Sequence, residues 1–173
     1  AAAMKKGAIV RVPQYVKVVC WNLALKRRRI DVENGAESVY KDLTEDEEVN
    51  RMYVGNLGEF AFCMMFNLWP SFGLTPGGPD CVSHCGLTID VKCSANGQEP
   101  LRVHLRKKDK AKACDIYALI TGRGDVYTYR GCASALQLFD QGNLKTKYGT
   151  LKHSIDQGLL HDTFEQALAW RPE

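Results

Sequence analysis

The stretch PDCVSHCGLTIDVKCS holds two aspartates, Asp80 and Asp90, and a lysine, Lys92, placed two residues after the second aspartate. In its last part, apolar residues alternate with Thr88, Asp90 and Lys92, which is typical of a strand with one face in the core. Asp90 and Lys92 would then share the opposite face. That face of the predicted strand therefore carries an acid and an amine, two groups that could do chemistry side by side.

A tight hairpin would bring the two aspartates together. If residues 84–86 form a three-residue loop, with the glycine in the left-handed conformation that such loops often need, Ser83 pairs with Leu87. Each step outward keeps the sum of the paired positions constant, which places Asp80 directly opposite Asp90. Like charges facing each other across two strands are destabilising, so a fold that keeps them usually has a cation between them. Carboxylate oxygens suit a hard ion such as Mg²⁺ or Mn²⁺.

A third acid, Glu59, lies in a predicted helix on a largely apolar face, where an isolated carboxylate would be costly. This face also carries Met52, Gly55, Cys63 and Phe66. Gly55 and Gly58 remove side-chain bulk where the helix could approach a sheet closely. We expect this helix to lie across the hairpin and to bring Glu59 towards the two aspartates.

The elements that must position these residues follow from periodicity, capping signals and turn residues. Thr44 and Glu47 have the spacing of a capping box. We expect helices over 14–29, after Pro13, and over 44–69; a loop over 31–43; the hairpin over 80–93; strands over 101–106, 115–121 and 125–130; a helix over 133–139; a turn-rich stretch over 140–150; and a last helix opened by Asp162 and Glu165. The predicted fold is a single α/β domain with a central mixed β-sheet flanked by helices.

Composition favours an ordinary globular protein, with 45% hydrophobic and 25% charged residues in a chain of 173. The longest apolar run, residues 60–69, is too short for a transmembrane helix, and no signal peptide is recognisable. We therefore expect a cytoplasmic protein that does not associate with membranes. Ala1–Ala3 look like a remnant of an expression vector, so the predicted domain spans residues 4–173. Seven cysteines, an odd number, suggest free thiols in a reducing compartment.

Basic residues gather in two clusters although the net charge is only +3. The first is Lys26, Arg27 and Arg28, followed by Arg29. In the second, Arg102, His104 and Arg106 share one face of the predicted strand over 101–106, and Lys107 and Lys108 follow. Each cluster could be a solvated face, but together, near a reactive site, they could bind the phosphate backbone of a nucleic acid.

A different reading of the hairpin is a zinc site. Cys81, His84, Cys85 and Cys93 could offer soft ligands to zinc. Their spacing matches no established zinc pattern, and a tight loop would place Cys81 and Cys85 awkwardly around one ion. Small buried thiols are the other explanation for these cysteines.

Pro79 and Asp80, followed by Asp90, one apolar residue and Lys92, resemble the bipartite signature of the PD-(D/E)xK nuclease superfamily. This superfamily has the restriction-endonuclease-like fold and includes Holliday-junction resolvases and many phage nucleases. Its motif lies on a β-hairpin after a helix that often carries a further acid, and here GNLGEFAF, with Glu59, precedes the motif in that order. The resemblance covers roughly residues 44 to 121 and does not identify a subfamily.

The resemblance implies specific roles for these residues. Asp80, Asp90 and the backbone carbonyl of Val91 would hold a divalent metal, and Glu59 would complete that site or help to hold a second ion. Lys92 would orient or help to deprotonate the attacking water and stabilise negative charge in the transition state.

The sequence therefore predicts a DNA nuclease that depends on Mg²⁺ or Mn²⁺, most simply an endonuclease. The family resemblance adds selectivity for branched DNA as an option. A homodimer would suit relatives that cut two strands. The first alternative is a catalytically inactive nucleic-acid-binding domain on the same fold, and the second is a small zinc-stabilised interaction module.

Overall fold

The computed structural model describes residues 4–35, 42–74, 77–104, 114–147 and 150–172. Its centre is a mixed five-stranded sheet with the strand order β1-β6-β5-β3-β2, in which β3 and β5 are parallel and the other neighbours are antiparallel. These strands are β1 (Ile9–Arg11), β2 (Cys81–Val82), β3 (Thr88–Ser94), β5 (Ile116–Arg123) and β6 (Val126–Ser134). The predicted α/β class and the central mixed sheet are confirmed.

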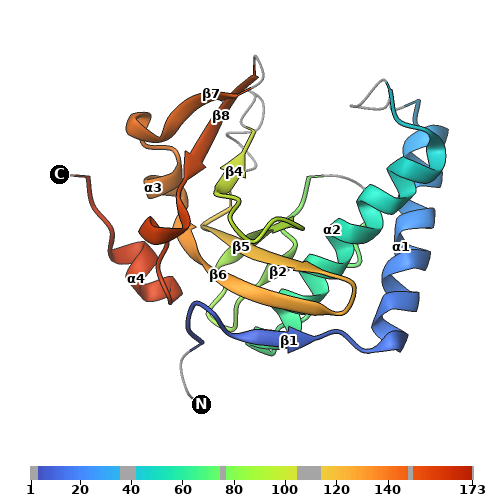
Figure 1. Cartoon of the computed structure of the whole chain (residues 1–173), viewed down its shortest axis with the longest axis horizontal. Helices are drawn as coiled ribbons and strands as arrows, with labels where there is room; N and C mark the ends of the chain where they lie inside the picture. Colours follow the sequence, from blue (N-terminus) through green and yellow to red (C-terminus); the bar gives the residue numbers. More distant parts are fainter. Residues whose placement is uncertain (1–3, 36–41, 75–76, 105–113, 148–149, 173) are drawn as a thin grey trace.

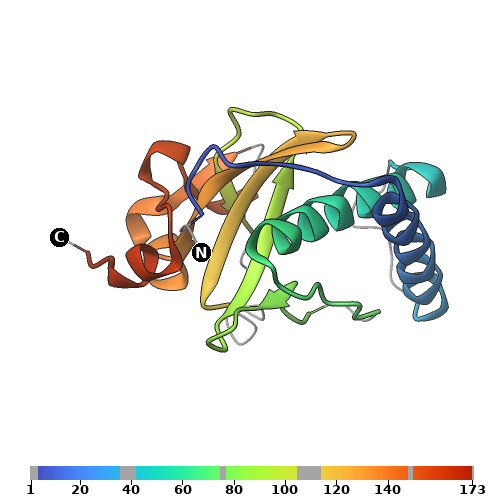
Figure 2. The ribbon, with the colours of Figure 1, turned by 90° about the horizontal axis from the view of Figure 1, so that it is seen from below.

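Two long helices cover one face of this sheet, α1 (Gln14–Glu33) and α2 (Glu45–Phe66). Helix α2 lies against the sheet and α1 packs on α2 (Figures 1 and 2). The predicted capping box is present, because the Thr44 Oγ1 accepts from the Glu47 N–H at 3.3 Å and the Thr44 N–H donates to the Glu47 carboxylate at 2.7 Å. Helix α2 ends where Asn67 takes the left-handed conformation, with φ of 51°.

A second, three-stranded sheet lies on the side of the main sheet away from α1 and α2 (Figure 2). Its strand order is β4-β8-β7, and all of its pairings are antiparallel. The strands are β4 (Leu101–Val103), β7 (Leu144–Lys147) and β8 (Thr150–Ile155). Short helices α3 (Ala135–Leu138) and α4 (Phe164–Ala169) and 3₁₀ turns at Gln141–Asn143 and Gln157–Leu159 complete the described chain.

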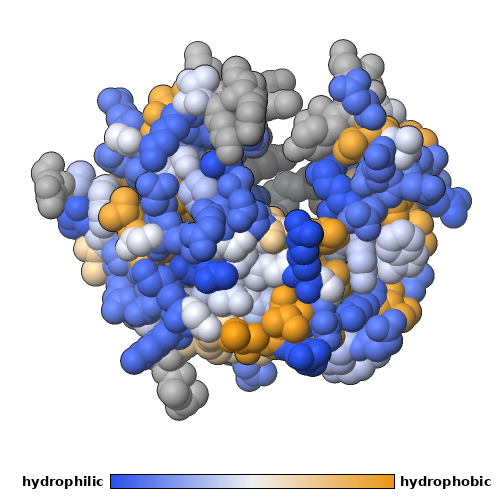
Figure 3. Space-filling model, in the orientation of Figure 1, coloured by the Kyte–Doolittle hydropathy of each residue, from blue (hydrophilic) through white to orange (hydrophobic). Residues whose placement is uncertain are grey.

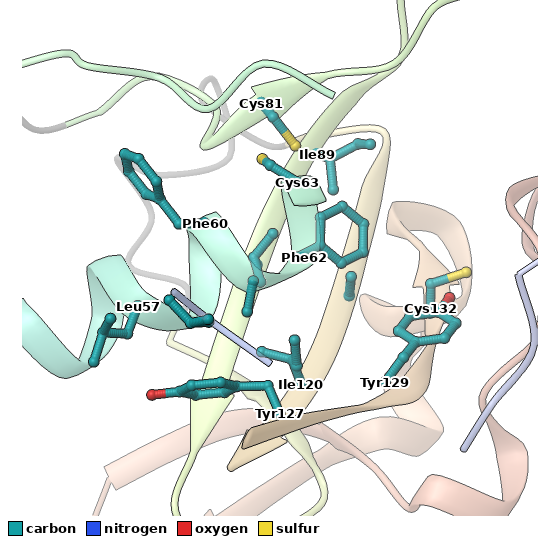
Figure 4. Close-up of a cluster of buried hydrophobic side chains, with 14 of the residues drawn as sticks. Leu57, Phe60, Phe62, Cys63, Cys81, Ile89, Ile120, Tyr127, Tyr129 and Cys132 are labelled. Carbon is teal, nitrogen blue, oxygen red and sulfur yellow. The ribbon is translucent and has the colours of Figure 1, made fainter. Parts of the chain in front are cut away.

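The alternation of side chains along β5 divides the core into two halves, one on each face of the main sheet. Ile116, Ala118 and Ile120 pack with α2, together with Phe62 and Tyr129 (Figure 4). On the other face of the main sheet, buried side chains of β5 pack with β4, β8 and α3; this second half includes Leu101, Val103, Tyr117, Leu119, Leu138 and Ile155. Strand β5 is therefore buried on both faces, as the continuous apolar run predicted.

Several predicted elements differ from the structure. Helix α1 continues to Glu33, beyond the predicted end at residue 29, and β6 extends to Ser134, so that the helix predicted over 133–139 shortens to α3. Strand β4 ends at Val103 and belongs to the small sheet, whereas the prediction over 101–106 was longer. Strand β1 was not predicted.

The stretch over 140–150 was wrongly taken as turns, because β7 and the start of β8 lie there. The last helix begins after Thr163, whose hydroxyl accepts from the Gln166 N–H at 3.2 Å, and so the predicted Asp162 and Glu165 pair is displaced by one residue.

Gly58 allows α2 to approach the sheet, as predicted. A Cβ on Gly58 would lie 2.4 Å from the Cys93 Cβ and 2.7 Å from its Sγ, far inside van der Waals contact. The prediction was wrong for Gly55, where an added Cβ would meet nothing within 4 Å. Only one of the two glycines is therefore required by helix packing.

The difference between Gly58 and Gly55 allows a matched test of how α2 packs, with one alanine variant at each position. We expect Gly58→Ala to lower the free energy of unfolding by about 1–3 kcal/mol, because the methyl group must push α2 away from Cys93. Gly55→Ala should raise it by up to about 1 kcal/mol, because alanine favours a helix and meets open space here. Urea denaturation of both variants measures the two effects. Equal changes in the two variants would contradict this packing.

Candidate functional site

The hairpin has the predicted register. Cys81 pairs with Ile89, and the Ser83 N–H donates to the Leu87 carbonyl at 2.8 Å. Residues 84–86 form the loop, and its glycine has φ of 89°. The pairing stops at Cys81, because the Asp80 N–H donates to the carbonyl of Ile89 at 2.9 Å instead of continuing the register. Asp80 is therefore not a direct ladder partner of Asp90, and this step of the prediction was wrong.

The carboxylate of Asp80 takes the place of a main-chain acceptor at this point. Its Oδ2 accepts from the Val91 N–H at 2.7 Å. The N–H and C=O of one residue in an extended strand point to the same edge. The backbone carbonyl of Val91, which the sequence offered as a metal ligand, is therefore directed to the same edge of β3 as the Asp80 carboxylate. The bond between Asp80 and Val91 lies outside the β2–β3 ladder, because β2 begins at Cys81 and its pairing with β3 does not reach Val91.

Asp90 and Lys92 share one face of β3, as predicted. The Lys92 ammonium donates to Asp90 Oδ1 at 2.6 Å, and the Asp90 side chain is only 18% exposed. Along the parallel ladder Asp90 lies beside Tyr117 and Lys92 beside Leu119. The pair therefore lies at the border between the second half of the core and solvent.

Glu59 reaches the site from α2, four residues before the buried Cys63. Its Oε2 lies 3.6 Å from the Arg27 guanidinium of α1. The same guanidinium donates to Asn56 Oδ1 at 2.5 Å and to the carbonyl of Gly73 at 3.0 Å. Arg27 therefore connects α1, α2 and the segment that leads to Asp80.

The charges of these residues act on one another although they come from different elements. Burial, with the neighbouring Glu59 and Asp90, raises the pKa of Asp80 to about 8. Burial also raises the pKa of Glu59, while Arg27 acts in the opposite direction and Asp90 adds to the rise. Burial alone would lower the pKa of Lys92, but Asp90, Asp80 and Glu59 outweigh it and raise that pKa. The fold thus brings three carboxylates and one ammonium into a common electrostatic field.

Glu59 and Asp80 lie in the wall of a cavity of about 620 Å³. Its walls come from helix α1, from one face of helix α2 and from residues 71–74 and 77–80. The further lining residues include Arg27, Asp31, Arg51, Met52, Gly55, Asn56, Pro79 and glycines of the segment before Asp80. Asp90 and Lys92 are not among the lining residues. The cavity therefore gives access to the site from the α2 side.

The donor chemistry of these residues fits a hard divalent cation, since carboxylate and carbonyl oxygens are the ligands that Mg²⁺ and Mn²⁺ prefer. Among the described residues, however, no three His, Cys, Asp or Glu side chains form a group that could hold a metal ion. Each carboxylate is engaged by its own donor: Asp80 by the Val91 N–H, Asp90 by Lys92, and Glu59 by Arg27. To bind one ion together, the carboxylates would have to rotate away from these donors.

The cysteines of the hairpin are separated in the structure. Cys81 is buried and its sulfur points towards that of Cys63 (Figure 4). Hydrogen bonding with Cys81, together with burial, raises the pKa of the Cys63 thiol. Cys85 is exposed in the loop, with its sulfur 3.2 Å from Ser83 Oγ, and Cys93 packs beside Gly58. These three cysteines do not converge on one point.

The first predicted basic cluster is mostly engaged within the protein. Arg28 forms an ion pair with the buried Glu48 at 3.0 Å, Arg27 is held as described above, and Lys26 is exposed. In the second cluster, Arg102 donates to Glu99 at 2.6 Å, and His104 is exposed just after β4. Arg106, Lys107 and Lys108 lie outside the described residues.

Sequence reasoning missed the wall of the cavity. Arg51, Gly55, Asn56 and Glu59 recur at helical spacing and share one face of α2. This face carries an arginine, an asparagine and a glycine around the buried Glu59, and that pattern could have predicted the wall of the cavity. The carbonyls of Ser71 and Gly73 accept from Arg27. Their contribution could not have been predicted from the sequence, because it depends on the path of an irregular segment.

Comparison of the chain with protein-family models, with curated proteins and with solved structures gave no significant match. Among the described helices, none combines the length and the apolar character needed to cross a membrane.

The raised pKa of Asp80 predicts how stability depends on pH in the absence of divalent ions. A carboxyl whose pKa is higher in the folded chain binds more protons when folded, so its contribution to stability is lost as the pH rises from about 4 to about 8. Asp80→Asn stays uncharged and keeps an acceptor for the Val91 N–H. Its melting temperature relative to wild type should therefore increase between pH 5 and pH 8.

Asp156→Asn is the control, because Asp156 is exposed and its side chain caps no helix. Thermal melts of the three proteins in EDTA at several pH values measure the effect. A difference between Asp80→Asn and wild type that stays constant over this pH range would contradict the assigned charge environment.

Proposed function

We propose that this protein is a nuclease that requires Mg²⁺ or Mn²⁺ and hydrolyses phosphodiester bonds in DNA, with a restriction-endonuclease-like core of the PD-(D/E)xK type. One arrangement supports this most: the Asp80 carboxylate accepts from the Val91 N–H at 2.7 Å, and the residues on either side of Val91, Asp90 and Lys92, pair with each other at 2.6 Å. Glu59 of α2 lies within electrostatic range of all three side chains. When all three are ionised, the acids Glu59, Asp80 and Asp90 outnumber the two cations that pair with them, Arg27 and Lys92, and a divalent cation would neutralise this negative excess.

In this proposal Asp80, Asp90 and the Val91 carbonyl hold the cation, with Glu59 as a further ligand. When bound, the cation supplies Lewis-acid polarisation of the scissile phosphate. Lys92 carries its proton next to Asp90 and places a positive charge beside the reacting phosphate, where it stabilises the negative charge that develops. The raised pKa of Lys92 favours this electrostatic role over that of a general base.

The residues that line the cavity beside Glu59 and Asp80 indicate what kind of substrate would bind there. Arg27 and Arg51 line it together with the carboxylates, so positive charge lies near a phosphate that binds in the cavity. No element of base-specific readout was recognised in the sequence, which favours recognition of the backbone or of DNA shape over a short sequence. Endonucleolytic cutting and a preference for branched DNA rest on the family resemblance alone.

The second candidate is a catalytically inactive nucleic-acid-binding domain on the same fold. It is favoured by the way each carboxylate is engaged by a donor of the protein, without a convergent group of three ligands among the described residues. In that case the carboxylates would belong to a remnant site, and DNA would bind without being cut.

Cleavage of labelled linear, single-stranded and four-way-junction DNA in Mg²⁺, Mn²⁺ or EDTA distinguishes the two. We expect wild type to cut only with metal, and Asp90→Ala and Lys92→Ala each to lower the rate by about 100-fold or more, since both groups act on the reacting phosphate. The ranking of the three DNAs would then define the substrate class.

Asp156→Asn serves as the active control, because this exposed residue lies outside the site. Circular dichroism of Asp90→Ala and Lys92→Ala tests whether the two variants remain folded. Wild type that binds these DNAs but never cuts them would refute the nuclease and support the binding domain.

A further inference from the structure

The outward face of the small sheet carries a row of basic side chains that the proposed reaction does not use. Arg102 of β4 lies opposite Ser154 of β8, and Lys152 of β8 lies directly opposite Lys145 of β7. Lys152 and Ser154 are two residues apart and therefore share a face, as do their ladder partners. The neighbours of Arg102 and Ser154 in sequence, Leu101, Val103 and Ile155, point the other way into the core.

These side chains line a pocket of about 180 Å³, together with Thr146. Ser154 is buried in it, and Arg102 is held in place by its 2.6 Å bond to Glu99. Lys145 is exposed and Lys152 half-buried. The surface over the small sheet and α3 is largely hydrophilic in the view of Figure 3. The pocket is therefore a depression that is lined by basic and hydroxyl-bearing residues and has room for a phosphate group.

Two lysines directly opposite each other across a ladder repel one another and destabilise the pair. Arg102 of the third strand adds a further positive charge to the same pocket, which Glu99 neutralises in part. This arrangement costs stability in the free protein. An anion between the lysines would remove the repulsion, in the same way that a cation would between facing carboxylates.

We propose that Arg102, Lys145, Lys152 and Ser154 form a second phosphate-binding site, which holds the backbone of a nucleic acid away from the reactive carboxylates. The cations come from three neighbouring strands, about 4.8 Å apart, and Arg102 is displaced by two residues along β8 from the Lys145 and Lys152 pair, so the three form a diagonal row across the sheet. A row of charges matches a linear polyanion, which presents phosphates in succession, better than a single small anion. Three of these four residues lie outside both basic clusters recognised in the sequence, and the site needs no metal.

The test is binding of fluorescent duplex DNA to the full chain in EDTA, where no cleavage occurs, at several salt concentrations. The slope of log K against log salt is negative, and each lost lysine–phosphate contact should reduce its magnitude by about 0.9. We therefore expect Lys145→Gln/Lys152→Gln to lose at least 10-fold in affinity and to reduce the magnitude of that slope by about 1 to 2. Lys5→Gln/Lys17→Gln is the matched control, since it removes two lysines that do not line the pocket.

A second arm titrates inorganic phosphate against each protein and so separates a nucleic-acid backbone from a free anion. Equal DNA affinity and equal slopes for wild type and the pocket variant would overturn the proposal, as would wild type that does not bind DNA in EDTA. Loss of phosphate binding without loss of DNA binding would overturn it in favour of a small-anion site. Because every measurement is made in EDTA, a failure of the nuclease proposal in the cleavage assay leaves this result standing.

Discussion

Three carboxylates that repel one another lie beside the part of β3 that β2 leaves unpaired, and the fold holds them together by giving each a separate donor. Asp80, Asp90 and Glu59 each take a different donor: a main-chain N–H, an ammonium and a guanidinium. The first two of these donors belong to β3 itself, and the third comes from α1 across α2. Removing any one of them would leave a partly desolvated negative charge, which costs far more than an exposed ion pair contributes.

The packing of α2 determines whether this electrostatic arrangement exists at all. Glu59 comes within range of Asp80 only because the next residue towards the N-terminus is Gly58, which lets the helix lie against Cys93. Arg27 then fixes the other side of Glu59 while its remaining bonds hold residues 71 and 73. The contact between Gly58 and Cys93 takes no part in the proposed reaction, yet it sets how closely Glu59 of α2 approaches Asp80.

Local signals explain how much of this could be read from the sequence. The capping box at Thr44, the three-residue loop before Leu87 and the alternation along β3 each depend on neighbouring residues, and all three predictions are confirmed. Strands β7 and β8 were missed because they lie in a stretch rich in glycine and lysine, and their hairpin joins a sheet through the pairing of β8 with β4, some fifty residues earlier. The Asp80 position was misplaced for a similar reason, since simple register cannot show that its N–H bonds one residue out of step. The docking of Glu59 was only a hypothesis until α2 could be placed on the sheet.

We propose that these carboxylates bind a divalent cation, and direct counting of bound Mn²⁺ by electron paramagnetic resonance tests this without any substrate. We expect saturable binding by wild type in the micromolar to millimolar range, weakened at least 10-fold in Asp80→Asn and Glu59→Gln, both of which keep the shape of the side chain but lose its charge. Asp156→Asn should bind like wild type, because that residue lies outside the site. Wild type that leaves all Mn²⁺ free at millimolar concentration, or binding that is unchanged in both site variants, would show that these carboxylates do not hold a divalent cation.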